Sequence, residues 1–266
     1  MRNIKIIFTD LDGTLTYAPG KIDDSNKKIF EKLASIGIPV VINTGRSLPY
    51  TIALCKQFST SNYVIADNGA SVYNYVSKNM IYRSVINKES LEYMDSLVEK
   101  YHLLFVANGI EKRYSNKTED NIGYSYKERL SDITEEEISQ VVIESYSKED
   151  MMYFRKDLLE NTTLQIANKT KHVLEGKLLF YDITNNDVSK GKAIEKLCDY
   201  LNINVERAMA IGDSTNDIDM LETVGYKVAV ANASDEVKDI SNYLTLSNKQ
   251  NGVGIILNEV YSKINE

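Results

Sequence analysis

Short apolar runs, each followed by small polar residues, recur along the first quarter of the chain. Residues 4–8, 38–42 and 63–66 are rich in isoleucine and valine, a composition typical of strands buried on both faces. The segments between them, residues 24–37 and 49–58, place apolar side chains at helical spacing. Because strands and helices alternate, the pattern predicts a parallel sheet with helical crossovers.

The alternation is interrupted after about residue 71 and returns after residue 187. A capping box at Thr134 is expected to open a helix inside the interruption. In full, the interruption predicts strands at 72–75, 80–83, 103–107, 164–167 and 178–183, helices at 88–101 and 134–146, and a polar loop with one short strand at 109–126. Elsewhere the pattern predicts a short hairpin at 15–22, strands at 208–211, 228–230 and 243–245, and helices at 189–201, from 219 onward and at 252–264.

This change of rhythm predicts the domain organisation. The fold class is α/β, with a Rossmann-like parallel-sheet core formed by residues 1–83 and 185–266. Residues 84–184 are expected to form an inserted α+β cap that closes over the site and selects the substrate. Neither boundary is a linker rich in proline, glycine or serine, so the boundaries depend on the change of rhythm alone.

The composition narrows the classes of protein to consider. The 266 residues are 43% hydrophobic and 26% charged, which is ordinary for a soluble globular protein with a sizeable core. A formal net charge of −7 argues against a nucleic-acid partner, and no segment approaches the roughly 20 apolar residues of a membrane helix. The first strand begins almost at Met1, so no signal peptide and a cytoplasmic location are expected. Nothing in the sequence indicates an obligatory protein partner.

The few thiols and imidazoles exclude several kinds of site. Cys55 and Cys198 are far apart and belong to no CxxC pair, so packing is their expected role. His102 and His172 are isolated, which argues against a histidine-rich metal site and against a Ser-His-Asp triad. Any metal should therefore be a hard cation held by oxygen atoms.

Carboxylates gather at one edge of the predicted sheet. Asp10 and Asp12 follow the first strand, and because side chains two apart on a strand share a face, both are expected to reach one small object. Two like charges this close are tolerated beside a cation or a shared proton. From these residues alone, an Asp-Gly turn capped by its own side chains is the alternative interpretation. Polar segments at 44–47, 67–70 and 212–217 end further strands at the same edge, which favours a functional site.

Four motifs in this order resemble those of the haloacid dehalogenase superfamily, and more narrowly its Cof-type phosphatases. The motifs are Asp10-Leu11-Asp12-Gly13-Thr14, Thr44-Gly45, Lys190, and Gly212-Asp213-x-x-Asn216-Asp217. Asn68-Gly69-Ala70, Asn232-Ala233, Tyr243-Leu244-Thr245 and Gly252-Val253 match as secondary features. Thr44 and Lys190 are 146 positions apart whereas Asp10 and Thr44 are 34 apart, so the resemblance places the cap between the second and third motifs.

The resemblance implies a magnesium-dependent phosphatase of small phosphorylated metabolites, such as sugar phosphates or phosphorylated cofactors. Asp10 would be the nucleophile that forms an aspartyl-phosphate, and Asp12 would protonate the leaving group and then activate water. Mg²⁺ would be held by the carboxylates of Asp10 and Asp213 and the main-chain carbonyl of Asp12, with Asp217 orienting them. The groups expected around the phosphate are the Leu11 and Gly45 amides and the side chains of Thr44, Lys190 and Asn216.

Other interpretations remain open at this point. Taken singly, Asn216 fits an Asx-type turn, Thr44 a helix cap and Lys190 a solvated cation. A receiver-type signalling domain also uses aspartates, a threonine, a lysine and magnesium, although it is about half this length and its acceptor aspartate lies on a later strand. A phosphomutase-like protein, or a non-hydrolytic protein of the same fold that binds phosphorylated ligands, is the further alternative.

Helical geometry separates two lysines that flank one glycine. On a helix that begins near Ser189, the apolar residues Ile194, Leu197 and Leu201 fall within about 40° of Lys190. Lys192 falls about 200° away. An inward ammonium at a helix N-terminus is desolvated and faces the positive end of the helix dipole, so it needs a negative partner. The Asp10 and Asp213 cluster, with the phosphate it would bind, is the expected partner of Lys190.

Overall fold

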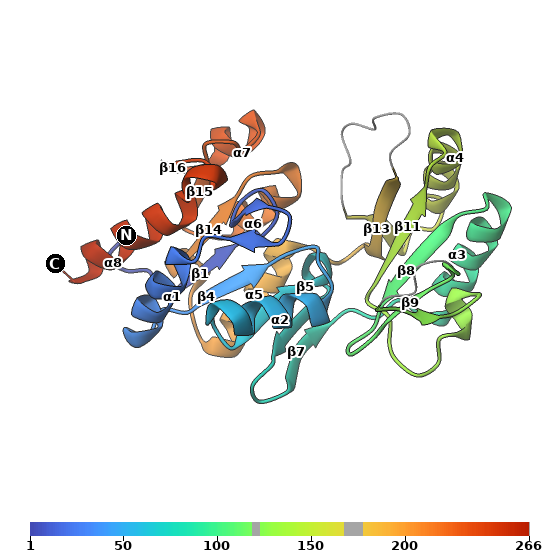
Figure 1. Ribbon diagram of the computed structural model, residues 1–266, viewed down its shortest axis with the longest axis horizontal. Helices are drawn as coiled ribbons and strands as arrows, with labels where there is room; N and C mark the ends of the chain where they lie inside the picture. Colours follow the sequence, from blue (N-terminus) through green and yellow to red (C-terminus); the bar gives the residue numbers. More distant parts are fainter. Residues whose placement is uncertain (119–122, 168–177, 266) are drawn as a thin grey trace. The chain divides into compact units, whose positions relative to one another are not determined.

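The computed structural model describes residues 1–118, 123–167 and 178–265, and its chain divides into two compact units (Figure 1). We call the first the core unit; it comprises Met1–Arg46, Tyr50–Tyr82 and Ser189–Glu266. We call the second the inserted unit; it comprises Ser47–Pro49 and Arg83–Val188. The expected cap, residues 84–184, falls within the inserted unit.

The core unit is built on one long sheet in the order β16-β15-β14-β1-β4-β5-β6-β7. Neighbouring strands from β16 to β5 are parallel, and β6 returns antiparallel to β5. The strands are β1 (Ile6–Thr9), β4 (Val40–Asn43), β5 (Tyr63–Ala66), β6 (Ser71–Asn74), β7 (Asn79–Arg83), β14 (Ala208–Gly212), β15 (Tyr226–Val230) and β16 (Tyr243–Thr245). The predicted α/β class with a parallel-sheet core is confirmed.

Helices cover both faces of this sheet. Right-handed crossovers place α1 and α2 on one face, where α8 packs against α1, and α5, α6 and α7 on the other, where α5 packs against α6 (Figure 1). The helices are α1 (Ser25–Ser35), α2 (Leu48–Phe58), α5 (Lys190–Leu201), α6 (Ile218–Thr223), α7 (Asp235–Ile240) and α8 (Gly252–Asn265). The predicted hairpin after the first strand is also present, as β2 (Thr16–Ala18) and β3 (Lys21–Ile22).

The inserted unit has a sheet of its own in the order β10-β9-β8-β11-β13-β12, with α3 and α4 against one face (Figure 1). Its elements are β8 (Leu104–Asn108), β9 (Arg113–Ser115), β10 (Ser125–Tyr126), β11 (Gln140–Ser145), β12 (Leu164–Ile166), β13 (Leu179–Asn185), α3 (Lys88–Lys100) and α4 (Lys148–Leu158). Strands β8, β11, β13 and β12 are antiparallel neighbours. The segment 109–126, expected to be a loop with one short strand, contains two, β9 and β10, and its residues 119–122 are outside the described residues.

The helix expected at residues 134–146 is wrong. The structure has no helix there, and Gln140–Ser145 is instead strand β11, paired with β8 on one side and β13 on the other. The run of Val141, Val142 and Ile143 favours a strand, and its pairing on both edges outweighs the capping box. Glu136 accepts hydrogen bonds from the Tyr114 hydroxyl and the Glu111 amide, so it is part of the fold rather than a solvated charge. Helices α4 and α7 are not predicted by the sequence pattern.

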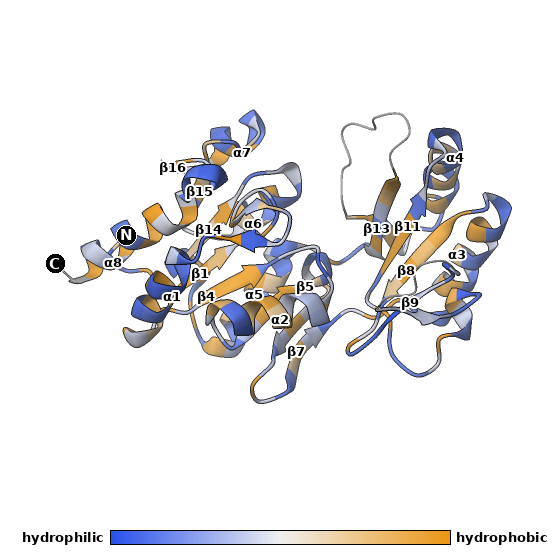
Figure 2. Ribbon diagram, viewed as in Figure 1, coloured by the Kyte–Doolittle hydropathy of each residue, from blue (hydrophilic) through white to orange (hydrophobic). Residues whose placement is uncertain are grey.

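Each unit has its own apolar interior. In Figure 2 the hydrophobic colour is concentrated in the strands, and the helices carry it on the side that faces the sheet. Strands β1 and β4 are buried along their whole length, as expected for central parallel strands. Among the described residues, no helix is long and apolar enough to cross a membrane.

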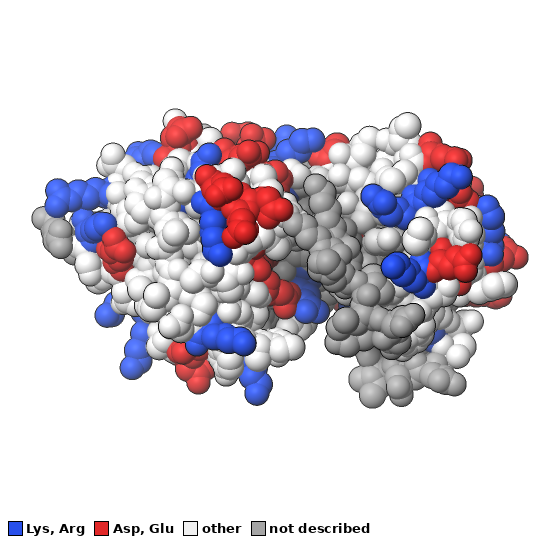
Figure 3. Space-filling view, turned by 90° about the horizontal axis from the view of Figure 1, so that it is seen from above, with Lys and Arg blue, Asp and Glu red and all other residues white. Residues whose placement is uncertain are grey.

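The charged side chains on the face seen in Figure 3 are mixed in sign. Both signs occur on the described residues of each unit, and several acidic side chains lie together on the left half of the view.

Candidate active site

The carboxyl ends of three neighbouring strands bring the predicted motifs together. Strands β14, β1 and β4 are adjacent and parallel, and Asp213, Asp10 and Thr44 are the residues that follow them. The Asp10 amide donates to the carbonyl of Ile211 at 2.9 Å, which continues the sheet pairing up to the site. Parallel pairing therefore places residues about 200 positions apart in the sequence at one edge.

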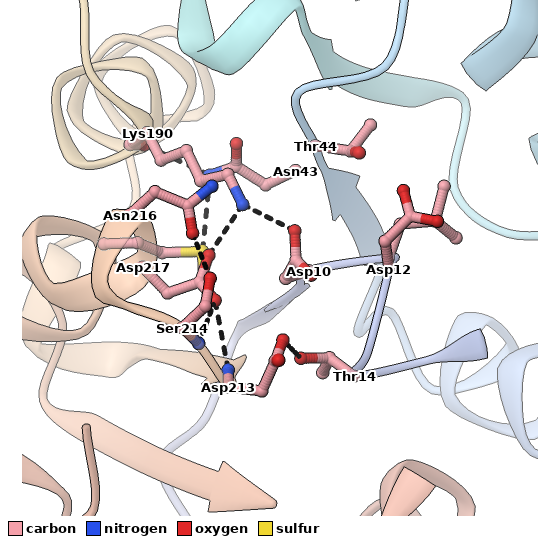
Figure 4. Close-up of polar contacts among 12 residues, drawn as sticks. Asp10, Asp12, Thr14, Asn43, Thr44, Lys190, Asp213, Ser214, Asn216 and Asp217 are labelled. Atoms are coloured by element: carbon pink, nitrogen blue, oxygen red, sulfur yellow. Dashed lines mark hydrogen bonds and ion pairs between the residues drawn. The ribbon is translucent and has the colours of Figure 1, made fainter. Parts of the chain in front are cut away.

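Lys190 is the centre of the hydrogen-bond network at this edge (Figure 4). Its Nζ donates to Asp10 Oδ1 at 2.5 Å and to Asp217 Oδ1 at 2.6 Å. Lys190 is the first residue of α5, whose N-cap Ser189 accepts from the Lys192 amide. Only 2% of Lys190 is exposed, whereas Lys192 is exposed. The predicted inward orientation of Lys190 is confirmed.

Asp213 and Asp217 are held by groups from their own loop and from the first motif. Thr14 Oγ1 donates to Asp213 Oδ1 at 2.7 Å. Asp217 Oδ2 accepts from the amides of Asp213 and Ser214, and the Ser214 side chain accepts in return from the Asp217 amide. Gly13 has φ +89°, and a Cβ there would lie 2.6 Å from Asp213 Oδ2, so glycine is required for this close approach.

Electrostatics make this cluster a candidate metal centre. Oxygen atoms of Asp10, Asp213 and Asp217 lie within 4.8 Å of one another. Burial, followed by the charges of Asp217 and Asp213, raises the pKa of Asp10 well above its usual value, although Lys190 opposes the shift. Burial and Asp217 raise the pKa of Asp213 to about 6, against the hydrogen bond from Thr14. Burial alone would lower the pKa of Lys190, but Asp10 and Asp217 raise it, so the ammonium persists.

The charges of this cluster do not balance. Three carboxylates lie together beside one ammonium, which bonds directly to two of them, Asp10 and Asp217, and this leaves an excess of negative charge at a largely buried site. A divalent cation would neutralise it, and the oxygen-only donor set suits a hard cation such as Mg²⁺. The residues present therefore fit the metal that the sequence predicts.

Asp12 does not join the other carboxylates. Its Oδ2 and Oδ1 accept from Arg46 Nε at 2.7 Å and from a terminal Arg46 nitrogen at 3.0 Å. In Figure 4 its side chain lies on the far side of Asp10 from Lys190. The Arg46 guanidinium also lies 5.7 Å from the centre of the Tyr50 ring. In this structure a bidentate ion pair with Arg46 holds the Asp12 side chain, so Asp12 is not among the carboxylates whose oxygen atoms gather within 4.8 Å of one another.

Arg46 and Thr14 are site residues to which the sequence analysis gives no role. Thr14 belongs to the first motif, and Arg46 directly follows Gly45. Their positions, Thr14 within the first motif and Arg46 directly after the second, are the feature of the sequence that could have indicated a role in the site. Their partners, 199 and 34 positions away, could not be inferred without the fold.

Three of the groups expected around a phosphate, Leu11, Thr44 and Asn216, retain donors. Thr44 Oγ1 accepts from the Arg46 amide at 3.2 Å, which leaves its proton to donate, and Asn216 Oδ1 accepts from Ser214 Oγ. Within the described ranges, the Leu11 amide and the Asn216 Nδ2 have no acceptor. A Cβ at position 45 would lie 2.8 Å from Asn68 Oδ1, so the Asn68 side chain packs against Gly45. Such donors around one edge are suited to an anion.

Comparisons with known proteins agree with this geometry. A family model described as haloacid dehalogenase-like hydrolase matches residues 7–257. The chain is 29% identical over 252 residues to the 5-amino-6-(5-phospho-D-ribitylamino)uracil phosphatase YcsE of Bacillus subtilis (strain 168), covering 94% of this chain and 93% of that protein. It is 28% identical over 251 residues to a phosphoglycolate phosphatase of Methanobrevibacter smithii, covering 94% and 96% of the two proteins. A crystal structure of a haloacid dehalogenase-like hydrolase from Bacteroides thetaiotaomicron has the same fold, with a TM-score of 0.86 at 22% identity over 97% of this chain and 99% of its own.

Proposed function

Because this chain belongs to the haloacid dehalogenase-like hydrolase family and is a phosphoric monoester hydrolase, we propose that it cleaves small phosphorylated metabolites with bound Mg²⁺ and through a phosphorylated Asp10. The observation that carries the proposal is the buried Lys190 ammonium between Asp10 and Asp217, beside a third carboxylate at the sheet edge. Family membership sets aside the receiver-type alternative.

Asp10 is suited to be the nucleophile. Lys190 engages its Oδ1, and Oδ2 has no hydrogen-bond donor in the part of the chain that the structure describes. One oxygen is thus anchored while the other attacks phosphorus, and the alkoxide of the substrate leaves. Water then attacks the aspartyl-phosphate, which releases inorganic phosphate and restores Asp10. The donors of Leu11, Thr44, Gly45, Lys190 and Asn216 would stabilise the charge on the phosphoryl oxygens in both steps.

Asp12 is proposed as the acid of the first step and the base of the second. It would give a proton to the leaving oxygen and later take one from the attacking water. Both of its oxygens accept from Arg46, so at least one must leave that ion pair before proton transfer. We propose that this exchange accompanies binding of the substrate.

The metal would be held by the carboxylates of Asp10 and Asp213 and by the main-chain carbonyl of Asp12. Asp217 is proposed to orient these groups, since both of its oxygens are already occupied by Lys190 and by two main-chain amides. When bound, Mg²⁺ would supply positive charge to the phosphoryl oxygens and to the buried carboxylates.

The substrate class is proposed as sugar phosphates or phosphorylated cofactors. The two relatives described above are named for the small phosphorylated compounds they act on. One of these compounds contains a ribityl phosphate, and the other is phosphoglycolate. The inserted unit is proposed to choose among such compounds, because the groups that engage phosphate all lie in the core unit.

The test is release of phosphate from p-nitrophenyl phosphate and from a panel of phosphorylated metabolites. We expect turnover with Mg²⁺, none after treatment with EDTA, and recovery when Mg²⁺ is restored. Ca²⁺ should inhibit, because its larger and more flexible shell places the carboxylate of Asp10 less favourably for attack. Full activity in EDTA would overturn the metal assignment. Phosphate binding without turnover on the whole panel would favour the non-hydrolytic alternative, and transfer between two positions of a phosphosugar would favour a mutase.

A further inference from the structure

The peptide group between Lys190 and Gly191 is held at both ends by side chains from other elements. Asn43 Nδ2 donates to the Lys190 carbonyl at 3.1 Å, and the Gly191 amide donates to Asp219 Oδ2 at 2.8 Å. Asn43 is the last residue of β4, and Asp219 lies in the first turn of α6. We call this arrangement the peptide clamp: the Lys190–Gly191 peptide together with Asn43 and Asp219.

The clamp supplies a bond that the helix itself does not. The first amides of a helix have no partner within it, and the N-cap Ser189 satisfies the amide of Lys192 but not that of Gly191. Asp219, from another helix, accepts from Gly191 instead. The Asp219 carboxylate at the N-terminus of α5 also offsets the repulsion between the Lys190 ammonium and the positive end of the helix dipole.

The close packing of α5 on α6 depends on glycine at position 191. A Cβ there would lie 2.5 Å from Thr223 Oγ1 and 2.7 Å from the Asp219 carbonyl oxygen. The Thr223 hydroxyl donates to that same carbonyl at 2.7 Å, and this hydrogen bond holds in place the surface of α6 that faces Gly191. The peptide that carries Lys190 is therefore seated against a defined surface of α6.

We propose that Asn43 and Asp219 are positioning residues that act through Lys190. Lysine has four flexible side-chain bonds, and holding its ammonium in one place costs conformational freedom. Here its Nζ is bonded by Asp10 and Asp217 at one end, while the clamp fixes its main chain at the other. The clamp keeps the ammonium aimed at the phosphoryl group in the reaction proposed above, and so this inference rests on the proposed function.

The test is a double-mutant cycle between Asp219 and Lys190, measured as kcat with p-nitrophenyl phosphate. Asp219→Ala is expected to lower kcat about tenfold, the usual scale for one hydrogen bond to a charged group. In a Lys190→Ala background the same change should cost less than about twofold, because the residue it positions is gone. Asp219→Asn keeps an oxygen that can accept from Gly191 and should recover most of the loss.

Controls separate positioning from general damage. Glu222→Ala, on the exposed face of the same helix, should leave kcat unchanged, and every variant is assayed well below its own measured unfolding temperature. A second double-mutant cycle, between Asn43→Ala and Lys190→Ala, tests the bond to the carbonyl end of the same peptide and should give the same pattern. An unchanged kcat in Asp219→Ala, or an equal loss with and without Lys190, would overturn the clamp. If the wild-type protein itself releases no phosphate, the proposed function fails, and that result is distinct from a failed cycle.

Discussion

The two units of this protein use buried acidic side chains in different ways. In the core unit, Asp10 and Asp217 are buried and face one ammonium that comes from a distant segment. In the inserted unit, Asp95 is equally buried, but it accepts from the amides of Leu130 and Ser131 at 2.6 and 3.0 Å and so caps a single turn, with the Arg129 guanidinium 3.6 Å away as its counter-charge. A buried carboxylate whose oxygens accept from main-chain amides stabilises the fold. A group of buried carboxylates that outnumbers its cationic partners is instead suited to bind a cation.

Sheet topology explains where each pattern arises. Parallel strands send all their carboxyl ends to one edge, so β1, β4 and β14 concentrate polar residues there. The main strands of the inserted unit are antiparallel, and successive strands end at opposite edges. The chemistry is therefore expected in the core unit and the selection of substrate in the inserted unit.

The largest predicted effect compares Asp10 with Asp95. Asp10→Asn should abolish turnover, because an amide cannot attack phosphorus, while thermal stability stays the same or rises. Burial and the neighbouring carboxylates raise the pKa of Asp10, so its ionised form is disfavoured beside them, and a neutral amide in its place should not lower stability. Asp95→Asn should keep turnover but lose about 1–2 kcal/mol of stability, since hydrogen bonds to a charged acceptor are weakened.

Phosphate release and thermal unfolding, measured on both variants, check this contrast. If Asp10→Asn turned over like the wild type, the nucleophile would lie elsewhere. If Asp95→Asn lost turnover at unchanged stability, the division between the two units would be wrong.

A second prediction compares two lysines of one helix. Lys190→Ala should lose at least about two orders of magnitude in kcat, the scale observed when a group that stabilises transition-state charge is removed. Lys192→Ala should stay near the wild type, because that side chain is exposed. Steady-state kinetics on the pair decide the matter, and comparable losses in both variants would contradict the role given to Lys190.

What the sequence could predict was local or periodic. Apolar runs predicted the positions of β1, β4, β5 and β14, and helical spacing alone predicted that the Lys190 side chain is buried. Both predictions were possible because the buried side chains of a strand or helix recur with the period of that element. The four motifs identified the family, and their strand-end positions located the carboxylates of the candidate metal centre.

What the sequence could not predict depends on pairing between distant segments. The capping box at Thr134 favoured a helix at residues 134–146, but Gln140–Ser145 pairs with β8 on one side and β13 on the other. No local sequence pattern reveals these two pairings. Asp12 bonds to Arg46, 34 positions away, and the Gly191 amide bonds to Asp219 on another helix. Such contacts exist only once the sheet has brought the segments together.

The smallest predicted effect concerns the inserted unit, where one face of the sheet packs on α3 and α4. Side chains alternate between the faces of a strand, so Asn108 and Arg113, which pair across β8 and β9, lie on the opposite face. Arg113 Nε donates to Asn108 Oδ1 at 3.1 Å, and the guanidinium lies 4.8 Å from the centre of the Tyr124 ring. A cation held in this way is a suitable contact for the polar part of a phosphorylated metabolite.

We therefore expect Arg113→Ala to change the ratios of kcat/KM across a panel of phosphoesters by roughly three- to tenfold, the worth of one polar contact. The Mg²⁺ concentration for half-maximal activity should stay constant, because the carboxylates that would hold the metal lie in the core unit. Lys88→Ala is the matched control, since Lys88 begins α3 on the helical side of the same unit and pairs only with Glu92 among the described residues. It should leave the ratios unchanged. Equal ratios in wild type and Arg113→Ala would remove this residue from substrate selection, and a changed Mg²⁺ requirement would show that the units do not divide their tasks as proposed.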